Sequence, residues 1–214
     1  SMPKPSAKRL AHFQELVAYD RQYDAFGVSL AGMDEAGRGP LVGNVVAACV
    51  IMPESPLYEW IDDSKKLSAV RREELYAQIC ESALYVGIGE ATPEEIDGQT
   101  ILRATRLAME RAAKDAPASL CIVDAVKGLS LPYPVSSIIK GDATSYHVAA
   151  ASIVAKVTRD HQMLSYAQQY PQYGFERNMG YGTTQHIEAL RRFGPTPKHR
   201  RTFIKHFVEE EADS

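Results

Sequence analysis

Two apolar runs near the start of the chain constrain the fold most. The first covers residues 28–33 and the second covers residues 43–52, where Pro53 follows. Apolar runs of this length predict buried strands, and the proline marks where the second strand ends. Since only a short link joins the two runs, we expect them to pair as an antiparallel hairpin.

The link between these two strands carries charged groups. Asp34 and Glu35 end the first strand, and Gly37-Arg38-Gly39 follows. Glycines let a backbone approach a ligand without an intervening Cβ, which leaves their amides free to contact it. Two acids beside a guanidinium and such amides indicate a site for a metal and a phosphate. Neighbouring residues of a regular strand point to opposite faces, so the two acids converge only if the strand already turns at Glu35. The simpler alternative is a solvated corner.

The remainder of the chain alternates helical and strand patterns. Helical periodicity predicts helices at residues 4–23, 68–81, 92–113 with a break at Gly98, 145–170 and 183–193. Further strands are predicted at residues 83–91, 119–124 and 134–139. Helices that separate strands after a hairpin indicate a mixed α/β fold with about five strands. Without repeats or linkers, we expect one domain over residues 1–214, in which Ser1 is an expression-vector residue.

Charge and cysteine content limit the classes of protein. A net charge of −3 argues mildly against nucleic-acid binding, although a bound metal would offset part of the negative charge. Cys49, Cys80 and Cys121 form no C-x-x-C pair, and the first and last lie in apolar runs, which suits reduced cysteines and a cytoplasmic protein. No apolar run has the length of a membrane span, so we expect no membrane contact.

Two more acids extend the candidate metal site. Asp124 ends the predicted strand 119–124, and Asp142 follows Lys140-Gly141 before the longest helix. Mg²⁺ prefers oxygen ligands, and two such ions can clamp a phosphodiester between them. Since no His or Cys pair has zinc spacing, carboxylates are the plausible ligands. For Asp124 taken alone, a solvated acid at a strand end is the alternative.

Several polar residues could contact a phosphate or a sugar. Ser64, Lys65 and Lys66 can donate to phosphate oxygens, unless they are simply solvated surface residues. Lys140 and Lys156 are further candidates, although Lys156 could instead pair with Asp160 one helical turn away. Two further residues have other candidate roles. Tyr181 has glycine neighbours, which predict an exposed ring, and His186 could be a surface, capping or catalytic residue.

The C-terminal segment supplies positive charge. Residues 191–206 contain no acid, and Arg200-Arg201 lie at their centre. This basic segment overlaps the C-terminal region 195–214. It is either a face that binds a duplex or a solvated tail. We expect the last acidic residues, 209–211, to be frayed.

Read in order, these blocks resemble bacterial ribonuclease HII. The resemblance rests on the motifs at 32–41, 62–67, 123–124, 140–143, 150–160 and 180–183, and extends from about residue 32 to residue 194. It implies a ribonuclease H-like fold with a helical C-terminal region, and a monomeric endonuclease that uses Mg²⁺ or Mn²⁺ at a two-metal site. The implied activity cuts the RNA strand of RNA–DNA hybrids. It also cuts 5′ to ribonucleotides embedded in duplex DNA, as in ribonucleotide excision repair, and leaves a 3′-hydroxyl and a 5′-phosphate.

The resemblance also implies roles for individual residues. The catalytic and metal-binding acids would be Asp34, Glu35, Asp124 and Asp142. Substrate would be bound by Gly37, Arg38, Gly39, Ser64, Lys65, Lys66, Lys156, Tyr181, Arg200 and Arg201. The glycine loop would read the ribose 2′-hydroxyl, which distinguishes RNA from DNA, and Tyr181 would pack on the neighbouring sugar. Ala125 stands where the family usually has a glycine.

Two alternatives to this reading remain. Ribonuclease HIII is the first, and the arginine of Gly37-Arg38-Gly39 together with the expected lack of an extra N-terminal domain argue against it. A hybrid-binding protein without catalytic activity is the second. The presence of all four acids argues against that alternative, and a metal-dependent cleavage assay would decide between them.

Overall fold

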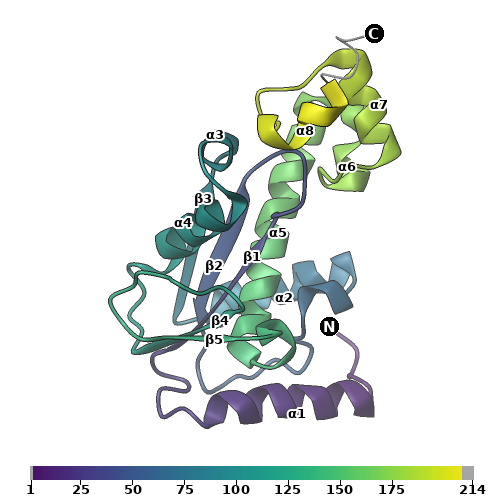
Figure 1. Ribbon diagram of the computed structural model, residues 1–214. Helices are drawn as coiled ribbons and strands as arrows, with labels where there is room; N and C mark the ends of the chain where they lie inside the picture. Colours follow the sequence, from purple (N-terminus) through teal and green to yellow (C-terminus); the bar gives the residue numbers. More distant parts are fainter. Residues whose placement is uncertain (1, 209–214) are drawn as a thin grey trace.

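The computed structural model describes residues 2–208 and contains a five-stranded mixed sheet (Figure 1). Its order is β3-β2-β1-β4-β5. The strands are β1 (Leu30–Ala36), β2 (Val45–Ile51), β3 (Tyr85–Ala91), β4 (Leu120–Asp124) and β5 (Val135–Ile138). The first three strands are antiparallel neighbours, whereas β4 runs parallel to β1 and β5 parallel to β4. The predicted hairpin and the mixed five-stranded sheet are therefore confirmed.

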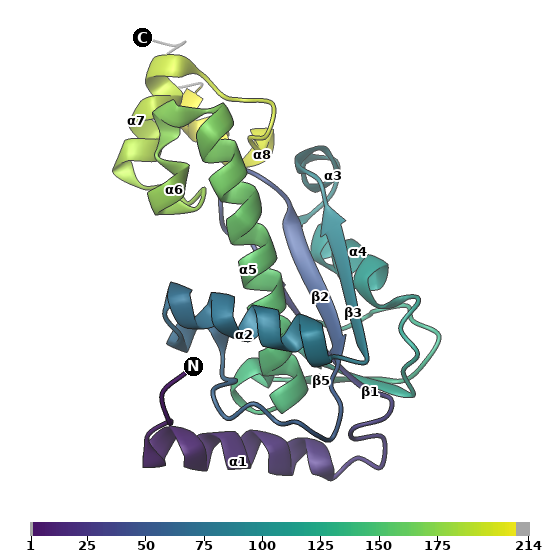
Figure 2. The same cartoon turned by 180° about the vertical axis from the view of Figure 1, so that it is seen from behind.

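Helices cover both faces of the sheet (Figures 1 and 2). One face packs against α1 (Ala7–Arg21), α2 (Ala69–Ser82) and the long α5 (Tyr146–Gln169). The other face packs against α4 (Ile101–Ala113), which follows the short α3 (Pro93–Asp97). Each face thus has its own apolar core, one dominated by aliphatic and aromatic side chains and the other rich in alanine.

The C-terminal part of the chain forms a small helical cluster at the C-terminal end of α5 (Figures 1 and 2). Its helices are α6 (Phe175–Asn178), α7 (Thr184–Phe193) and α8 (Arg201–Val208). They share an apolar core with α5 that includes Phe175, Leu190 and Ile204. The helical C-terminal region that the resemblance implied is confirmed, although periodicity alone did not predict α8, and the alternative of a solvated tail is wrong for residues 191–206. The acidic residues 209–211 lie outside the described residues.

Local sequence explains where the helices begin. Ser68 and Ser145 are N-caps whose side chains accept hydrogen bonds from backbone N–H groups of α2 and α5. Thr92 and Glu95 form a reciprocal capping box at α3, and Gly98 ends that helix as predicted. Short 3₁₀ turns at Ser64–Lys66, Gly141–Ala143 and Pro171–Tyr173 connect longer elements.

A close contact fixes α5 against the central strand. A Cβ placed on Gly32 of β1 would lie 2.3 Å from the backbone carbon of His147, in the first turn of α5. Only glycine allows this approach, because any side chain there would clash with backbone atoms. The contact holds the start of α5 beside the end of β1 that carries Asp34.

The cysteines have the state that the sequence predicts. All three are free thiols, with Cys49 and Cys121 buried and Cys80 exposed. Among residues 2–208, no helix is both long enough and apolar enough to cross a bilayer.

Candidate active site

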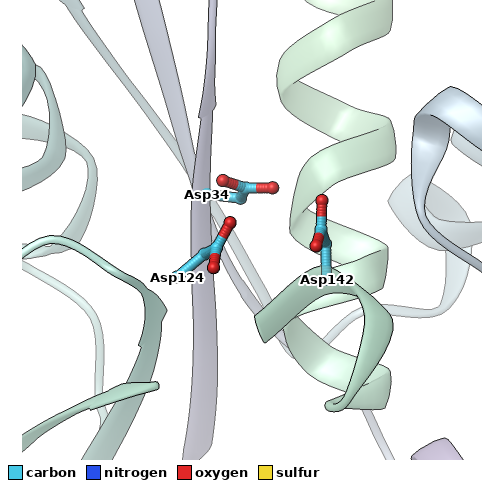
Figure 3. A group of neighbouring side chains, drawn as sticks. All are labelled: Asp34, Asp124 and Asp142. Atoms are coloured by element: carbon cyan, nitrogen blue, oxygen red, sulfur yellow. The ribbon is translucent and has the colours of Figure 1, made fainter. Parts of the chain in front are cut away.

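Three aspartates converge at one end of the sheet. The register pairs Met33 of β1 with Val123 of β4, so Asp34 and Asp124 follow at equivalent positions of parallel neighbours. Asp142 comes from the 3₁₀ turn after β5. Each of the three offers a carboxylate oxygen, and these oxygens lie within 4.8 Å of one another (Figure 3). The sequence prediction that these acids share a site is consistent with this geometry.

The aspartate cluster carries strong electrostatic repulsion. Burial, followed by the charges of Glu35 and Asp142, raises the pKa of Asp34 well above its ordinary value. Burial, followed by the charges of Asp63 and Asp124, raises the pKa of Asp142 to about 6. Both side chains are almost fully buried. Carboxyl groups held together out of water favour the binding of a cation.

Glu35 lines the same cavity but lies outside the group of three. The ladder with β2 continues regularly through Glu35 and Ala36, so the turn at Glu35 that convergence of the two acids would need is absent. Its carboxylate lies 3.6 Å from the Arg38 guanidinium. Burial is the main cause that raises the pKa of Glu35, and its Oε2 is buried with no hydrogen-bond partner among the described residues. An additional cation would satisfy that oxygen.

The turn after β4 fixes the orientation of Asp124. The Gly141 N–H donates to Asp124 Oδ1 at 2.8 Å, which ties the strand end to the 3₁₀ turn of Asp142. Immediately after the acid, Ala125 adopts φ 57°, a left-handed conformation that favours glycine. The backbone at this position therefore has a conformation that favours glycine, although the residue is alanine.

A cavity of about 310 Å³ opens beside the acids. Its lining includes most of the predicted site residues: Asp34, Glu35, Gly37, Arg38, Gly39, Ser64, Lys65, Asp124, Asp142, Lys156 and Tyr181. Lys66 does not belong to it, because it lines a separate cavity with Arg9, His12 and Asp62. Lys140 lies outside the lining as well. Consecutive side chains of the 3₁₀ turn at 64–66 point about 120° apart, so Lys65 and Lys66 line different cavities.

The cationic residues in the cavity differ in their partners. Lys65 Nζ lies 3.8 Å from Asp142 Oδ2 but is largely exposed. Lys156 Nζ donates to Asp160 Oδ1 at 2.7 Å, so the alternative of an intrahelical pair is confirmed. Ser64 is buried, and its N–H donates to Ser152 Oγ at 3.2 Å. Of these residues, Lys65 is the most accessible to a phosphate.

Tyr181 lies at the mouth of the cavity with 48% of its surface exposed. A Cβ on Gly39 would lie 3.4 Å from Tyr181 Cε1, so the ring stands beside the glycine loop. The Tyr181 carbonyl accepts a hydrogen bond from His186 Nδ1 at 2.9 Å. His186 is fully buried, and its Nε2 lies 2.8 Å from His199 Nε2, so the alternative of a surface role is wrong.

Arg200 is not a surface residue that contacts phosphate, and that prediction is wrong. Its side chain is fully buried, and its guanidinium donates to the carbonyls of Gly37, Arg38, Pro40 and Gly43. The neighbouring Arg201 is exposed at the start of α8, where its N–H donates to Asp97 Oδ2 at 2.9 Å. A basic run in sequence therefore divides into one buried and one exposed cation.

Sequence reasoning missed Arg159. This buried residue of α5 lines the cavity and donates to the carbonyls of Val42, Asn44 and Met179. Burial lowers its pKa to about 10, so the guanidinium stays charged near neutral pH. A signal was available, because Arg159 lies four residues after Ala155 and four before Met163, on the buried stripe of the helix.

The acids fit a hard divalent cation such as Mg²⁺ or Mn²⁺. Three carboxylates within reach of one ion, raised pKa values and an unpartnered Glu35 oxygen all fit oxygen coordination. The donor set lacks the thiolate and imidazole groups that zinc prefers.

Comparison with known proteins agrees with this geometry. The family model described as ribonuclease HII matches residues 31–209. A ribonuclease HII of Geobacillus kaustophilus is 50% identical over 194 residues, which span 89% of this chain and 74% of that protein. One from Polynucleobacter asymbioticus is 51% identical over 181 residues, which span 81% of this chain and 92% of that protein.

Solved structures show the same fold. The ribonuclease H2 of Pyrococcus horikoshii superposes with a TM-score of 0.74 at 26% identity, over 86% of this chain and 99% of that chain. The ribonuclease HII of Archaeoglobus fulgidus, solved in a complex with PCNA, has a TM-score of 0.70 at 26% identity, over 81% and 94%. With a family model that matches most of its length, this chain belongs to the ribonuclease HII family.

Proposed function

We propose that this protein is a metal-dependent endonuclease that cuts 5′ to ribonucleotides embedded in duplex DNA. Family membership makes it a ribonuclease H that acts on RNA–DNA hybrids. The proposal adds cleavage at single ribonucleotides, dependence on Mg²⁺ or Mn²⁺, and products with a 3′-hydroxyl and a 5′-phosphate. The observation that carries it is the aspartate cluster, which shares one cavity with the glycine loop and Tyr181.

Different residues of the cavity lining would have different roles. Asp34, Asp124 and Asp142, with Glu35, would hold one or two divalent ions at the scissile phosphate. Bound there, such ions activate a water molecule and stabilise the charge that develops on the phosphate. No side chain is needed as a covalent nucleophile.

The glycine loop and Tyr181 would recognise the nucleotide. Backbone N–H groups of the Gly37-Arg38-Gly39 loop can donate to a ribose 2′-hydroxyl, which deoxyribose lacks. The Tyr181 ring, half exposed beside Gly39, offers a flat surface to the next sugar. Lys65, Lys156 and Arg201 are candidates for contacts with phosphates, and Ser64 supports the turn that presents Lys65.

A cleavage assay tests this function directly. The substrate is a labelled DNA duplex that carries one ribonucleotide, incubated with Mg²⁺, with Mn²⁺ or with a chelator. We expect a single cut 5′ to the ribonucleotide in the presence of either metal and none with the chelator. The control is Asp34→Asn, which should slow cleavage about a thousandfold or more at the same metal concentration.

Two outcomes would contradict the proposal. Equal cleavage of an all-DNA duplex would show that the cavity does not read ribose. Binding of the ribonucleotide duplex without cleavage in either metal would favour the alternative of a binding protein that lacks catalytic activity.

A further inference from the structure

The glycine loop is held from behind by a buried cation. Arg200 immediately precedes α8, lies far from Gly37 in sequence and is fully buried. Its guanidinium makes four hydrogen bonds to carbonyls: from Nη2 to Gly37 at 2.5 Å, from Nη1 to Arg38 at 3.1 Å and to Pro40 at 2.8 Å, and from Nε to Gly43 at 2.9 Å. A single side chain thus occupies the carbonyl groups on one side of the loop.

These bonds determine where the loop's N–H groups point. In a planar trans peptide unit, the C=O and the N–H point in opposite directions. The Gly37 and Arg38 carbonyls accept hydrogen bonds from Arg200, so the same two peptide units direct the N–H groups of Arg38 and Gly39 away from it. Within residues 2–208, neither N–H has a hydrogen-bond partner. Both residues line the cavity that holds the aspartates, whereas Arg200 does not.

The main chain around Arg200 ties the same loop to the C-terminal helices. The Arg200 N–H donates to the Leu41 carbonyl at 2.9 Å, and the Gly43 N–H donates to the Lys198 carbonyl at 2.8 Å. An isolated bridge pairs Val42 with His199. The loop is therefore fixed by long-range contacts, since its own glycines would leave it free to adopt other conformations.

We infer that Arg200 is a positioning residue for ribose recognition, which orients the Arg38 and Gly39 N–H groups toward the 2′-hydroxyl of the bound nucleotide. The inference rests on the proposed function but assigns specificity to a residue that never touches the substrate. Its four donors match the fork of a guanidinium, and the ammonium of a lysine could not satisfy four carbonyls spread along the loop. The pKa of Arg200, lowered by burial to about 9, still leaves it charged at pH 7.5.

The test compares discrimination rather than activity. The variants are Arg200→Lys and Arg200→Met, with Arg103→Met as a control that removes an exposed arginine of α4 that does not line the cavity. Each protein is assayed at limiting substrate on two duplexes that differ at one sugar, which is either ribose or 2′-deoxy-2′-fluororibose. The ratio of the two kcat/KM values is independent of the fraction of protein that is folded.

We expect the ratio for wild type and Arg103→Met to be the same. In both Arg200 variants it should fall about fivefold or more, since disoriented N–H groups no longer favour the hydroxyl over fluorine. A purely structural role would lower the melting temperature and slow both substrates equally. An unchanged ratio in the Arg200 variants, with wild type active, would overturn the inference.

A second measurement covers the case in which the variants do not fold. The amide signals of Arg38 and Gly39 are followed by NMR in wild-type protein with a chelator, which prevents cleavage. The ribonucleotide duplex should shift both signals and slow their hydrogen exchange, whereas an all-DNA duplex of the same sequence should not. Equal responses to the two duplexes would overturn the inference. If wild-type protein does not cleave the duplex that contains one ribose, with either Mg²⁺ or Mn²⁺, the proposed function fails instead.

Discussion

Replacing Asp142 by asparagine should stabilise the metal-free fold while it removes activity. The pKa of Asp142 is raised from 3.8 to about 6, first by burial and then by the charges of Asp63 and Asp124. A raised pKa means that the folded state prefers the protonated acid. The carboxyl group therefore costs no stability below pH 4, and stability falls as the pH rises from about 4 to about 6.

The size of the effect follows from this difference in pKa. A gap of about 2 pKa units corresponds to about 3 kcal/mol once the group is ionised in both states. The cavity is open to solvent and Lys65 nearby is 81% exposed, so screening reduces the expected gain to about 1–2 kcal/mol. For a chain of this length, that gain raises the melting temperature by about 2–8 °C at pH 8.

Thermal or urea unfolding in a chelator would measure the effect. Asp142→Asn is compared with wild type at pH 4.5 and pH 8, with Asp115→Asn as an exposed-acid control at the end of α4. The gain should appear at pH 8, shrink at pH 4.5 and be absent in the control. Added Mg²⁺ or Mn²⁺ should then stabilise wild type more than Asp142→Asn. Equal stability of variant and wild type at pH 8 would refute the reasoning.

Three further predictions concern single residues. Ala125→Gly should raise the free energy of unfolding by about 1 kcal/mol in urea, because φ 57° strains an alanine; destabilisation would contradict this. Tyr181→Ala should slow cleavage of a single-ribonucleotide duplex about tenfold to a hundredfold with an almost unchanged melting temperature, whereas Tyr181→Phe should retain much of the activity; early unfolding of the alanine variant would make Tyr181 a core residue. Burial, with the charge of His186, lowers the pKa of His199 to about 3, so its contribution to stability is present above pH 6.5 and is lost as the pH falls, at about 1.4 kcal/mol per pH unit. His199→Gln should flatten that slope between pH 4 and 6.5, and an unchanged slope would speak against a neutral buried imidazole.

Much of the fold and of the acid cluster could be predicted from local sequence. Apolar runs and caps place the strands and most helices within a few residues, because burial and capping repeat at short spacings. Asp34 and Asp124 end strands that turn out to be parallel neighbours, so two acids at strand ends meet at one edge. Asp142 follows a glycine turn just before the longest helix, where the sequence already indicated a site.

Only the tertiary structure decided which charged residues are buried and which face the cavity. Arg200 and Arg201 are indistinguishable as sequence, yet the first binds carbonyls 157–163 residues away while the second lies in solvent. Likewise, Lys65 and Lys66 are adjacent but line different cavities. A buried cation is stable only when distant groups satisfy every donor, and no local pattern records those partners. The sequence by itself therefore determined the elements and the chemistry of the acids, and the packing of the C-terminal helices against the glycine loop determined how that loop is held.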